Sequence, residues 1–468
     1  MLLCGIIDEL TKSAPETHAV SFFFCQATDV RINHATSVLR GLISMMVDQQ
    51  PILISHVRKQ YDKAGKQVFE DVNAWEALSE ILASILEDPL LRTTYLIIDA
   101  LDECTMGLYR LLEFVAQKSS AYPHIKWIVS SRNWPTIEET LDTLSQKTKL
   151  CLELNETSVA KAVAIFINYK VQKLAEKKKY NNENRDAVFQ HLSSNAHGTF
   201  LWVALVCKEL THVSKRHVRK KLQDFPSGLD ELYKRMLNQI RGLDDAELCK
   251  SLLGVMTTVY RPITFDELMS CIDLPEDIAH DYAEAYESLE EIIGLCGSFL
   301  TIRGRTISLV HQSAKDFLLQ EAEIFPGGED IVHYSIFSRS LRAMARTLRR
   351  DIYSLVHPGC PIEQVNQPDP DPLAAIDYAC IYWVDHLCRC SPNKNAIGDL
   401  QDSGPVGIFF RNHYLHWLEA LSLSRNLSGG VASILKLENL LQVCFYSYSS
   451  KHDSDNIPLD DTDEFTTY

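Results

Sequence analysis

The N-terminal third of the chain alternates between short apolar runs and segments with helical spacing. Runs of consecutive large apolar residues, such as Leu96-Ile97-Ile98, are typical of strands buried on both faces of a parallel sheet. Between the runs, apolar residues recur every three or four positions, which predicts helices. The predicted strands are 20–25, 95–99, 124–131 and 148–154, and the predicted helices are 1–10, 35–47, 75–86 and 108–116. This order predicts βαβ units in a doubly wound parallel sheet.

From Ser158 onward the strand patterns fade and helical spacing dominates. The predicted helices are 159–174, 198–210, 229–241 and 282–293, with a solvated loop at 180–184. Thr264 and Glu267 have the spacing of a capping box, which predicts the start of a further helix. Two short predicted strands follow at 299–302 and 306–310. A helix–helix–hairpin order of this kind suits a winged helix.

The last third of the chain is predicted to be helical again. Residues 330–445 carry helical patterns, interrupted by a proline-rich loop at 367–372 where proline removes backbone donors. From His452 onward the chain is acidic and has little apolar content, so this tail is predicted to be disordered. Its carboxylates are Asp453, Asp455, Asp460, Asp461, Asp463 and Glu464.

Composition narrows the classes of function. The 468 residues carry a formal net charge of −16, whereas a nucleic-acid binder needs a basic face for phosphates, so no nucleic-acid partner is expected. No apolar run reaches the length of a membrane span, so no membrane partner is expected either. The 13 cysteines are scattered without a Cys-x-x-Cys pair, which favours free thiols in a reducing, cytoplasmic setting.

Three carboxylates lie within five positions at the end of the apolar strand 95–99. Asp99, Asp102 and Glu103 would lie at the carboxyl end of a buried parallel strand, where such sheets open onto a ligand crevice. Mg²⁺ takes oxygen ligands and usually binds one or two carboxylates together with phosphates. The alternative is that Asp99 caps a following helix and the other two carboxylates are solvated.

A second apolar strand also ends in polar residues, at Val129-Ser130-Ser131-Arg132. If this strand lies beside the carboxylate strand, Arg132 can neutralise the charge of a terminal phosphate, because its planar fork of donors suits phosphate oxygens. The alternative is a surface arginine in a salt bridge.

Together these segments resemble the NACHT-type nucleoside triphosphatases, in the filamentous-fungal, NLR-like branch of the signal-transduction ATPases. Leu96–Cys104 is similar to the Walker B strand of that family, and Val129–Pro135 to its sensor-1 segment. Four further motifs occur in the family's order, from the first helical subdomain through the winged helix to the helical region beyond it: Gly198–Ala204, Pro226–Tyr233, Val310–Leu318 and His413–Ala420.

The resemblance implies roles for particular residues. In the family, ATP or ADP binds with Mg²⁺; Asp99 would hold the Mg²⁺ through water. Asp102 and Glu103 would order the attacking water, with Glu103 as the base. Arg132 would sense the γ-phosphate, and His311 would reach the bound ADP and lock the closed state. The alternative for His311 is a core histidine.

The resemblance also implies a fold class of α/β followed by mainly α. The expected order is an incomplete P-loop NTPase sheet, a helical subdomain, a winged helix, a second helical domain and an acidic tail. The corresponding residues are 1–155, 156–225, 226–325, 326–450 and 451–468.

One part of the family pattern is missing from the sequence. The phosphate cradle Gly-x-x-x-x-Gly-Lys-Ser/Thr does not occur, and Ala64-Gly65-Lys66-Gln67, which lies in a predicted loop, lacks its first glycine and its hydroxyl. We expect either a chain truncated before its first strand and P-loop or a degenerate family member. In both cases nucleotide binding should be weakened and ATP hydrolysis should be undetectable.

Two functions remain open at this point. The first is a nucleotide-controlled signalling switch in fungal nonself recognition or cell death, which associates with itself or with other NLR-type proteins. The second is a nucleotide-independent interaction module with helical surfaces. A third, DNA binding through the basic wing Arg303-Gly304-Arg305, is opposed by the overall acidity.

Overall fold

The structure, a computed structural model, describes most of the chain. The described residues are 2–13, 18–65, 69, 74–122, 124–132, 137, 140–141, 156–272, 282–355, 359–390 and 398–454. The predicted strand 148–154, the end of the sensor-1 segment at 133–135 and the tail beyond Ser454 lie outside these residues.

A parallel sheet of three described strands forms the centre of the N-terminal part. Its order is β1-β2-β3, so β2 is the middle strand; the bounds are β1 (His18–Phe24), β2 (Thr93–Asp99) and β3 (Ile125–Val129). Phe24 pairs in register with Asp99, and Ile98 with Val129. The parallel strands predicted from the apolar runs are therefore confirmed, with the burial deepest in β2, and the segments that follow the three strands meet at one edge.

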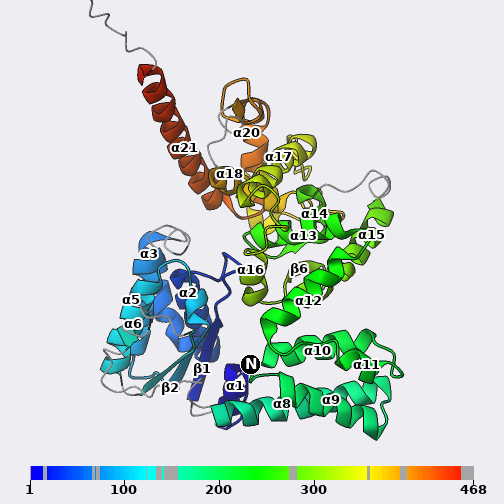
Figure 1. The fold of residues 1–468 in the computed structure, drawn as a ribbon. Coiled ribbons are helices and arrows are strands. Elements are labelled where there is room, and N and C mark those ends of the chain that lie inside the picture. The colour runs from blue at the N-terminus through cyan, green and yellow to red at the C-terminus, as the bar shows by residue number, and fades with distance from the viewer. Residues whose placement is uncertain are drawn as a thin grey trace, which may run out of the picture.

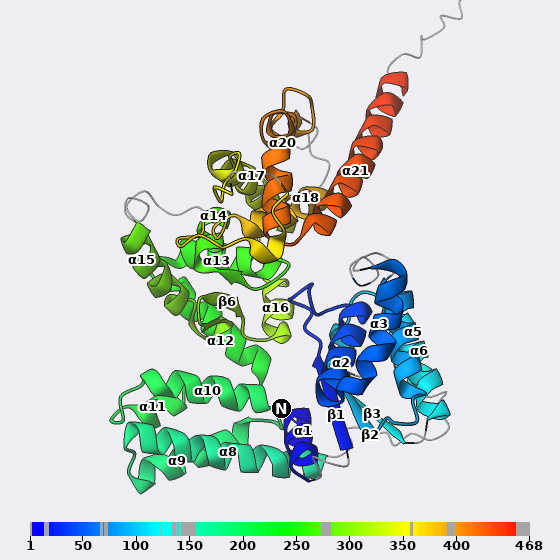
Figure 2. The ribbon, with the colours of Figure 1, turned by 180° about the vertical axis from the view of Figure 1, so that it is seen from behind.

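Helices cover both faces of this sheet (Figures 1 and 2). On one face α1 (Leu2–Ser13) packs Leu3 and Ile7 against Val20 and Ile97. The helices that build the main core with the sheet are α2 (Ala35–Gln49), α3 (Ile54–Ala64), α5 (Ala74–Leu86) and α6 (Leu108–Ala121).

Ala64 was expected in a loop, and this was wrong. It is the last residue of α3, and Gly65 ends the helix with a φ of 68°, a conformation that glycine adopts without a Cβ penalty. Lys66 and Gln67 lie outside the described residues.

A helical region and the helices of a winged helix share one large core. Its helices are α8 (Glu156–Lys178), α9 (Asn182–Asn195), α10 (Phe200–His212), α11 (Val218–Leu222), α12 (Leu229–Arg241) and α13 (Ala246–Thr258). The loop predicted at 180–184 is shorter than expected. The side chain of Asn181 accepts a hydrogen bond from the backbone N–H of Asn184 at 3.0 Å, so a helix begins within the polar run.

The hairpin that follows has the arrangement of a winged helix. Its small antiparallel sheet has the order β4-β6-β5. The elements are β4 (Ile263–Thr264), α14 (Phe265–Cys271), α15 (Tyr282–Leu295), β5 (Leu300–Arg303), β6 (Thr306–Leu309) and α16 (Gln312–Leu318). The predicted capping box is confirmed: Thr264 and Glu267 each bind the other's backbone N–H through the side chain.

The C-terminal helices form a third core around Trp383 and Trp417, both fully buried. They are α17 (Glu329–Thr347), α18 (Asp377–Arg389), α20 (Pro405–Leu423) and α21 (Leu427–Ser454). The far end of α21 extends away from the rest of the molecule (Figure 1). Residues 451–454 belong to this helix, so the predicted disordered tail does not begin at 451. None of the described helices is long and apolar enough to cross a membrane.

Candidate functional site

The carboxyl ends of β2 and β3 place Asp99 beside Ser130. The hydroxyl of Ser130 donates to Oδ1 of Asp99 at 2.5 Å and accepts the backbone N–H of Ala100 at 2.9 Å. Ala100 has a φ of 52°, and this left-handed turn directs the chain into the short helix η2 (Leu101–Glu103). Asp99 itself does not cap that helix, because Ala100 occupies the cap position without a side-chain bond. The alternative of a capping role for Asp99 is therefore wrong.

Arg132 follows β3 and pairs with Asp102. The backbone N–H of Arg132 donates to Oδ1 of Asp102 at 3.1 Å, and its Nε lies 3.2 Å from Oδ2. The side chain of Asp102 is only 5% exposed, whereas that of Arg132 is 46% exposed. Because a buried charge is costly unless it is paired, Arg132 compensates the charge of Asp102 in this structure.

The same arginine also reaches the winged helix. Its Nη1 lies 3.3 Å from Oδ2 of Asp316 on α16. In both ribbon views α16 lies between the sheet domain and the remainder of the winged helix (Figures 1 and 2). Arg132 therefore joins the sheet edge to α16 through two carboxylates, as the salt-bridge alternative predicted.

His311 is the N-terminal cap of α16. Its Nδ1 faces the backbone N–H of Ser313 at 3.1 Å and the Ser313 hydroxyl at 2.9 Å, and this hydroxyl lies 3.0 Å from that of Tyr233. Partial loss of solvent and the charge of Arg132 lower the pKa of His311. A neutral ring that accepts at Nδ1 carries its proton on Nε2. The alternative of a core histidine is wrong, because His311 is exposed.

Glu103 takes a different direction from its two acidic neighbours. Its Oε2 accepts the backbone N–H of Ala27, in the loop after β1, at 3.0 Å. Burial raises the pKa of Glu103, while the bond from Ala27 opposes this change. A carboxyl group that gains protons more readily than usual suits a general base, although its hydrogen bond to Ala27 also ties two loops together.

The arrangement fits a metal–phosphate group in part. Asp99, Arg132 and His311 offer a carboxylate, a guanidinium and an imidazole, which are groups that bind Mg²⁺ or phosphate oxygens. Among the residues that the structure describes, no three His, Cys, Asp or Glu side chains form a group that could hold a metal ion. A metal ion would therefore need phosphate ligands in addition to this edge.

Sequence reasoning located the edge of the sheet and missed the partners that organise it. Ser130, Ala27 and Asp316 bind Asp99, Glu103 and Arg132, respectively. Ser130 had a visible signal, as part of the polar cluster that ends the second apolar strand, whereas Asp316 lies in the motif Val310–Leu318 without a sign of its pairing with Arg132. No contact in the described part of the chain joins His311 directly to Asp99; His311 is brought to the site by α16.

Two family models and one curated protein match this chain. A family model described as "Nephrocystin 3, N-terminal" matches residues 1–132, and one described as "GPI inositol-deacylase, winged helix domain" matches residues 233–325. Both matches support the resemblance of the chain to the fungal NLR-like proteins. Over 459 residues it is 54% identical to the vegetative incompatibility protein HET-E-1 of Podospora anserina, an alignment that covers 94% of this chain. The aligned region covers 34% of that protein, so the chain spans about a third of the length of this curated relative.

Proposed function

We propose that the chain is the nucleotide-responsive part of a fungal signalling switch that acts in nonself recognition. The observation that carries the proposal is the position of Arg132, which binds Asp102 at the sheet edge and Asp316 on α16. An arginine that changes partners there would alter the contact between the two domains. The relative's role in vegetative incompatibility supports the signalling class.

The switch would work by a change in the partners of Arg132. A bound magnesium nucleotide supplies phosphate oxygens, with Asp99 as the carboxylate nearest the metal. Phosphate oxygens would compete with Asp102 and Asp316 for the guanidinium of Arg132, whose Nε and Nη1 contact these two carboxylates. His311 has Nδ1 occupied, which leaves its Nε2–H for an anionic ligand. A ligand of this kind shifts the population between closed and open domain arrangements.

Nucleotide binding by this chain is expected to be weak. The sequence contains no Gly-x-x-x-x-Gly-Lys-Ser/Thr string, whose backbone N–H groups and lysine normally surround the phosphates. We therefore propose impaired affinity and no measurable ATP hydrolysis, although Asp102 and Glu103 remain in place as candidate water-ordering groups.

Thermal melting with and without Mg-ADP tests the proposal. A ligand that binds only the folded state raises the melting temperature as its concentration exceeds the dissociation constant. A clear upward shift with millimolar Mg-ADP, absent with Mg²⁺ alone, supports the switch. A melting temperature that Mg-ADP leaves unchanged supports the nucleotide-independent interaction module.

The module has one structural observation in its favour. Leu427, Val431 and Leu435, four residues apart on α21, are 48%, 54% and 55% exposed. Exposed apolar residues on one face of a helix fit a partner protein, such as another NLR-type protein or a second copy of this chain.

A further inference from the structure

A small cavity lies where the loop after β1 meets the helical domains. Its volume is about 140 Å³, and we call it the junction cavity. Its lining includes Ala27 of the loop, Lys315 of α16, Glu329 and His333 of α17, and Arg389 of α18. In both ribbon views the loop after β1 extends from the sheet domain toward α16 (Figures 1 and 2).

The charged side chains that line the junction cavity do not balance. Lys315 and Arg389 contribute two positive charges, and Glu329 contributes one negative charge. Within the described residues, neither cation forms an ion pair with a carboxylate. Arg389 neighbours the hydroxyl of Tyr260, but a guanidinium has five N–H groups, so it keeps donors for a ligand.

Lys315 is the more unusual of the two cations, because its side chain is half-buried. Loss of solvent lowers the pKa of its ammonium group. A comparable half-buried lysine elsewhere in the chain, Lys250, pairs with both Glu247 and Glu323. A charge that is removed from water is costly unless it is paired, so an anion near Lys315 would stabilise the protein.

Glu329 does not supply this anion. Its Oε1 lies 3.5 Å from Nε2 of His333 on the same helix, and its side chain is 53% exposed. The charge of Glu329 opposes the lowering of the pKa of Lys315 without cancelling it. The carboxylate therefore stays hydrated at the mouth of the cavity, while the ammonium group has lost part of its water.

The volume of the junction cavity selects a small ligand. A cavity of about 150 Å³ is large enough for benzene, and a tetrahedral oxyanion such as phosphate or sulfate is somewhat smaller than benzene. A nucleoside diphosphate is much too large. An ammonium group and a guanidinium are the two side-chain groups that commonly bind phosphate oxygens, the first as a point charge and the second as a planar fork of donors.

An anion in the junction cavity would contact both parts of the molecule. The lining residue Ala27 belongs to the sheet domain, and its backbone N–H donates to Glu103 of the candidate site at 3.0 Å. Lys315 belongs to α16 and directly precedes Asp316, the partner of Arg132. Filling the cavity would therefore stabilise the contact between the loop after β1 and α16.

We propose that the junction cavity binds one small oxyanion, of the size and charge of phosphate or sulfate, through Lys315 and Arg389. The bound anion favours the domain arrangement of this structure. The site is separate from the sheet edge that carries Asp99, Arg132 and His311, and it does not depend on nucleotide binding.

Thermal melting of the full chain with inorganic phosphate tests the site. A ligand that binds only the folded state raises the melting temperature, by about 1–2 °C at ten times its dissociation constant for a chain of this length. We expect this rise relative to sodium chloride of equal ionic strength, and we expect it to saturate below about 10 mM sodium phosphate. Sodium sulfate should produce the same rise.

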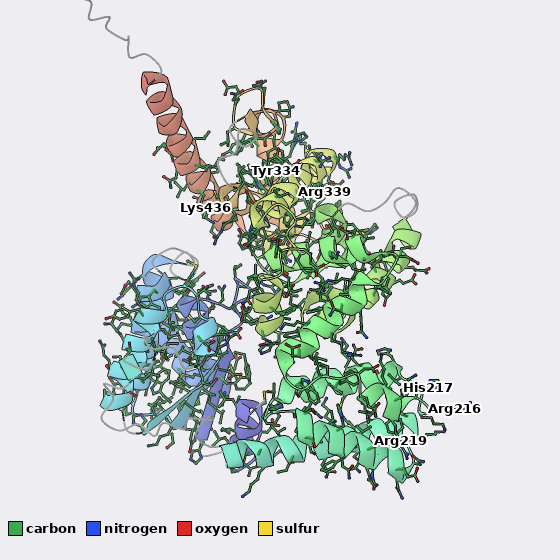
Figure 3. All side chains as sticks on the ribbon, viewed as in Figure 1. Arg216, His217, Arg219, Tyr334, Arg339 and Lys436 are labelled. Carbon is green, nitrogen blue, oxygen red and sulfur yellow. The ribbon has the colours of Figure 1, made fainter. Side chains whose placement is uncertain are left out.

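Two variants with the same change of charge make the result specific. Lys315→Gln/Arg389→Gln should abolish the rise. Lys215→Gln/Arg216→Gln should keep it, because these exposed cations lie far from α16 (Figure 3). Each protein without phosphate is its own reference, so a change in basal stability does not affect the comparison.

A third variant removes the dependence on the double substitution. Ala27→Leu fills the cavity from the loop, keeps the backbone N–H for Glu103 and changes no charge. It should also abolish the rise, even if Lys315→Gln/Arg389→Gln does not fold.

His311→Ala separates the junction cavity from the candidate nucleotide site. The rise should persist in this variant. A rise that is lost in His311→Ala and kept in Lys315→Gln/Arg389→Gln would place the phosphate at the sheet edge, which would overturn this proposal and leave the proposed function standing. No rise in the wild type, or a rise that is also lost in Lys215→Gln/Arg216→Gln, would overturn it as well.

Discussion

The guanidinium of Arg132 reaches Asp316 on α16, with 3.3 Å between Nη1 and Oδ2, while its Nε holds the buried carboxylate of Asp102. The two carboxylates differ in exposure: Asp316 is 40% exposed and Asp102 only 5%. One arginine thus stabilises a buried charge of the sheet domain and contacts the winged helix.

This difference predicts unequal effects of two substitutions. Asp316→Ala should change the free energy of unfolding by less than about 1 kcal/mol, because the pair is exposed. Arg132→Ala should cost about 1–3 kcal/mol, because Asp102 loses its partner while buried. Urea unfolding of the two variants measures both. Equal losses would show that Arg132 does not compensate Asp102.

Replacing Glu103 by an uncharged residue should stabilise the protein, by an amount that depends on pH. Because burial raises its pKa, the folded state binds the proton more readily than the unfolded state. The contribution of Glu103 to the free energy of unfolding is therefore greatest below the ordinary pKa of the carboxyl group, and it is lost as pH rises through the raised pKa. Glu103→Gln keeps an oxygen for the Ala27 N–H and removes the charge. It should melt higher than the wild type at about pH 7.5, with a smaller difference near pH 5. Glu113→Gln, exposed on α6, is the control and should show no such trend.

A buried pair of histidines predicts the opposite dependence on pH. Nδ1 of His333 lies 2.8 Å from Nδ1 of His386, and Nε2 of His386 lies 2.7 Å from the hydroxyl of Tyr378. The Tyr378 oxygen accepts the backbone N–H of Tyr260. With the Tyr378 O–H donating to Nε2 of His386, the proton of neutral His386 lies on Nδ1 and can donate to Nδ1 of His333. A further proton on Nδ1 of His333 would place its N–H against the Nδ1–H of His386, and the hydrogen bond between the two rings would be lost.

Burial lowers the pKa of both histidines, so the folded state keeps them neutral while the unfolded state takes up protons near their ordinary value. Stability from the pair is therefore present above about pH 6.5 and lost as pH falls below it. Around His333, Glu329 opposes the lowered pKa, whereas Lys315 and Arg389 add to it. His333→Gln keeps an acceptor and should flatten the fall in melting temperature between about pH 7.5 and 5.5. His217→Gln, at an exposed histidine, should not; an identical slope in both variants would contradict the assignment.

Arg261 predicts a large loss of stability on substitution. Its guanidinium binds Glu267 through two hydrogen bonds, of 2.7 and 3.0 Å, and both side chains are less than a tenth exposed. Arg261→Met leaves the Glu267 charge buried and should cost about 3–5 kcal/mol. The matched Arg241→Met removes an exposed partner of Glu323 and should cost less than about 1 kcal/mol. Chemical denaturation compares the two, and similar losses would contradict the reading of the buried pair.

The sequence predicted the sheet edge well, because consecutive apolar residues at Leu96-Ile97-Ile98 signal burial on both faces before the carboxylates begin. It could not predict the contact of Arg132 with Asp316, since these residues are 184 positions apart and only the docking of α16 joins them. It also misread Asn182–Asn184, where a side-chain cap at Asn181 starts a helix in a run of polar residues. The partners of the candidate site are tertiary contacts without a local pattern.

A calorimetric titration of the full chain with ADP in Mg²⁺ tests nucleotide control most directly. Our account predicts binding with a dissociation constant on the order of millimolar, because the edge has Asp99, Arg132 and His311 but no phosphate cradle. ADP at about ten times this dissociation constant would stabilise the folded state by about 1.4 kcal/mol. Binding should weaken further in His311→Ala. A micromolar dissociation constant, or no binding even at high ADP, would contradict the account.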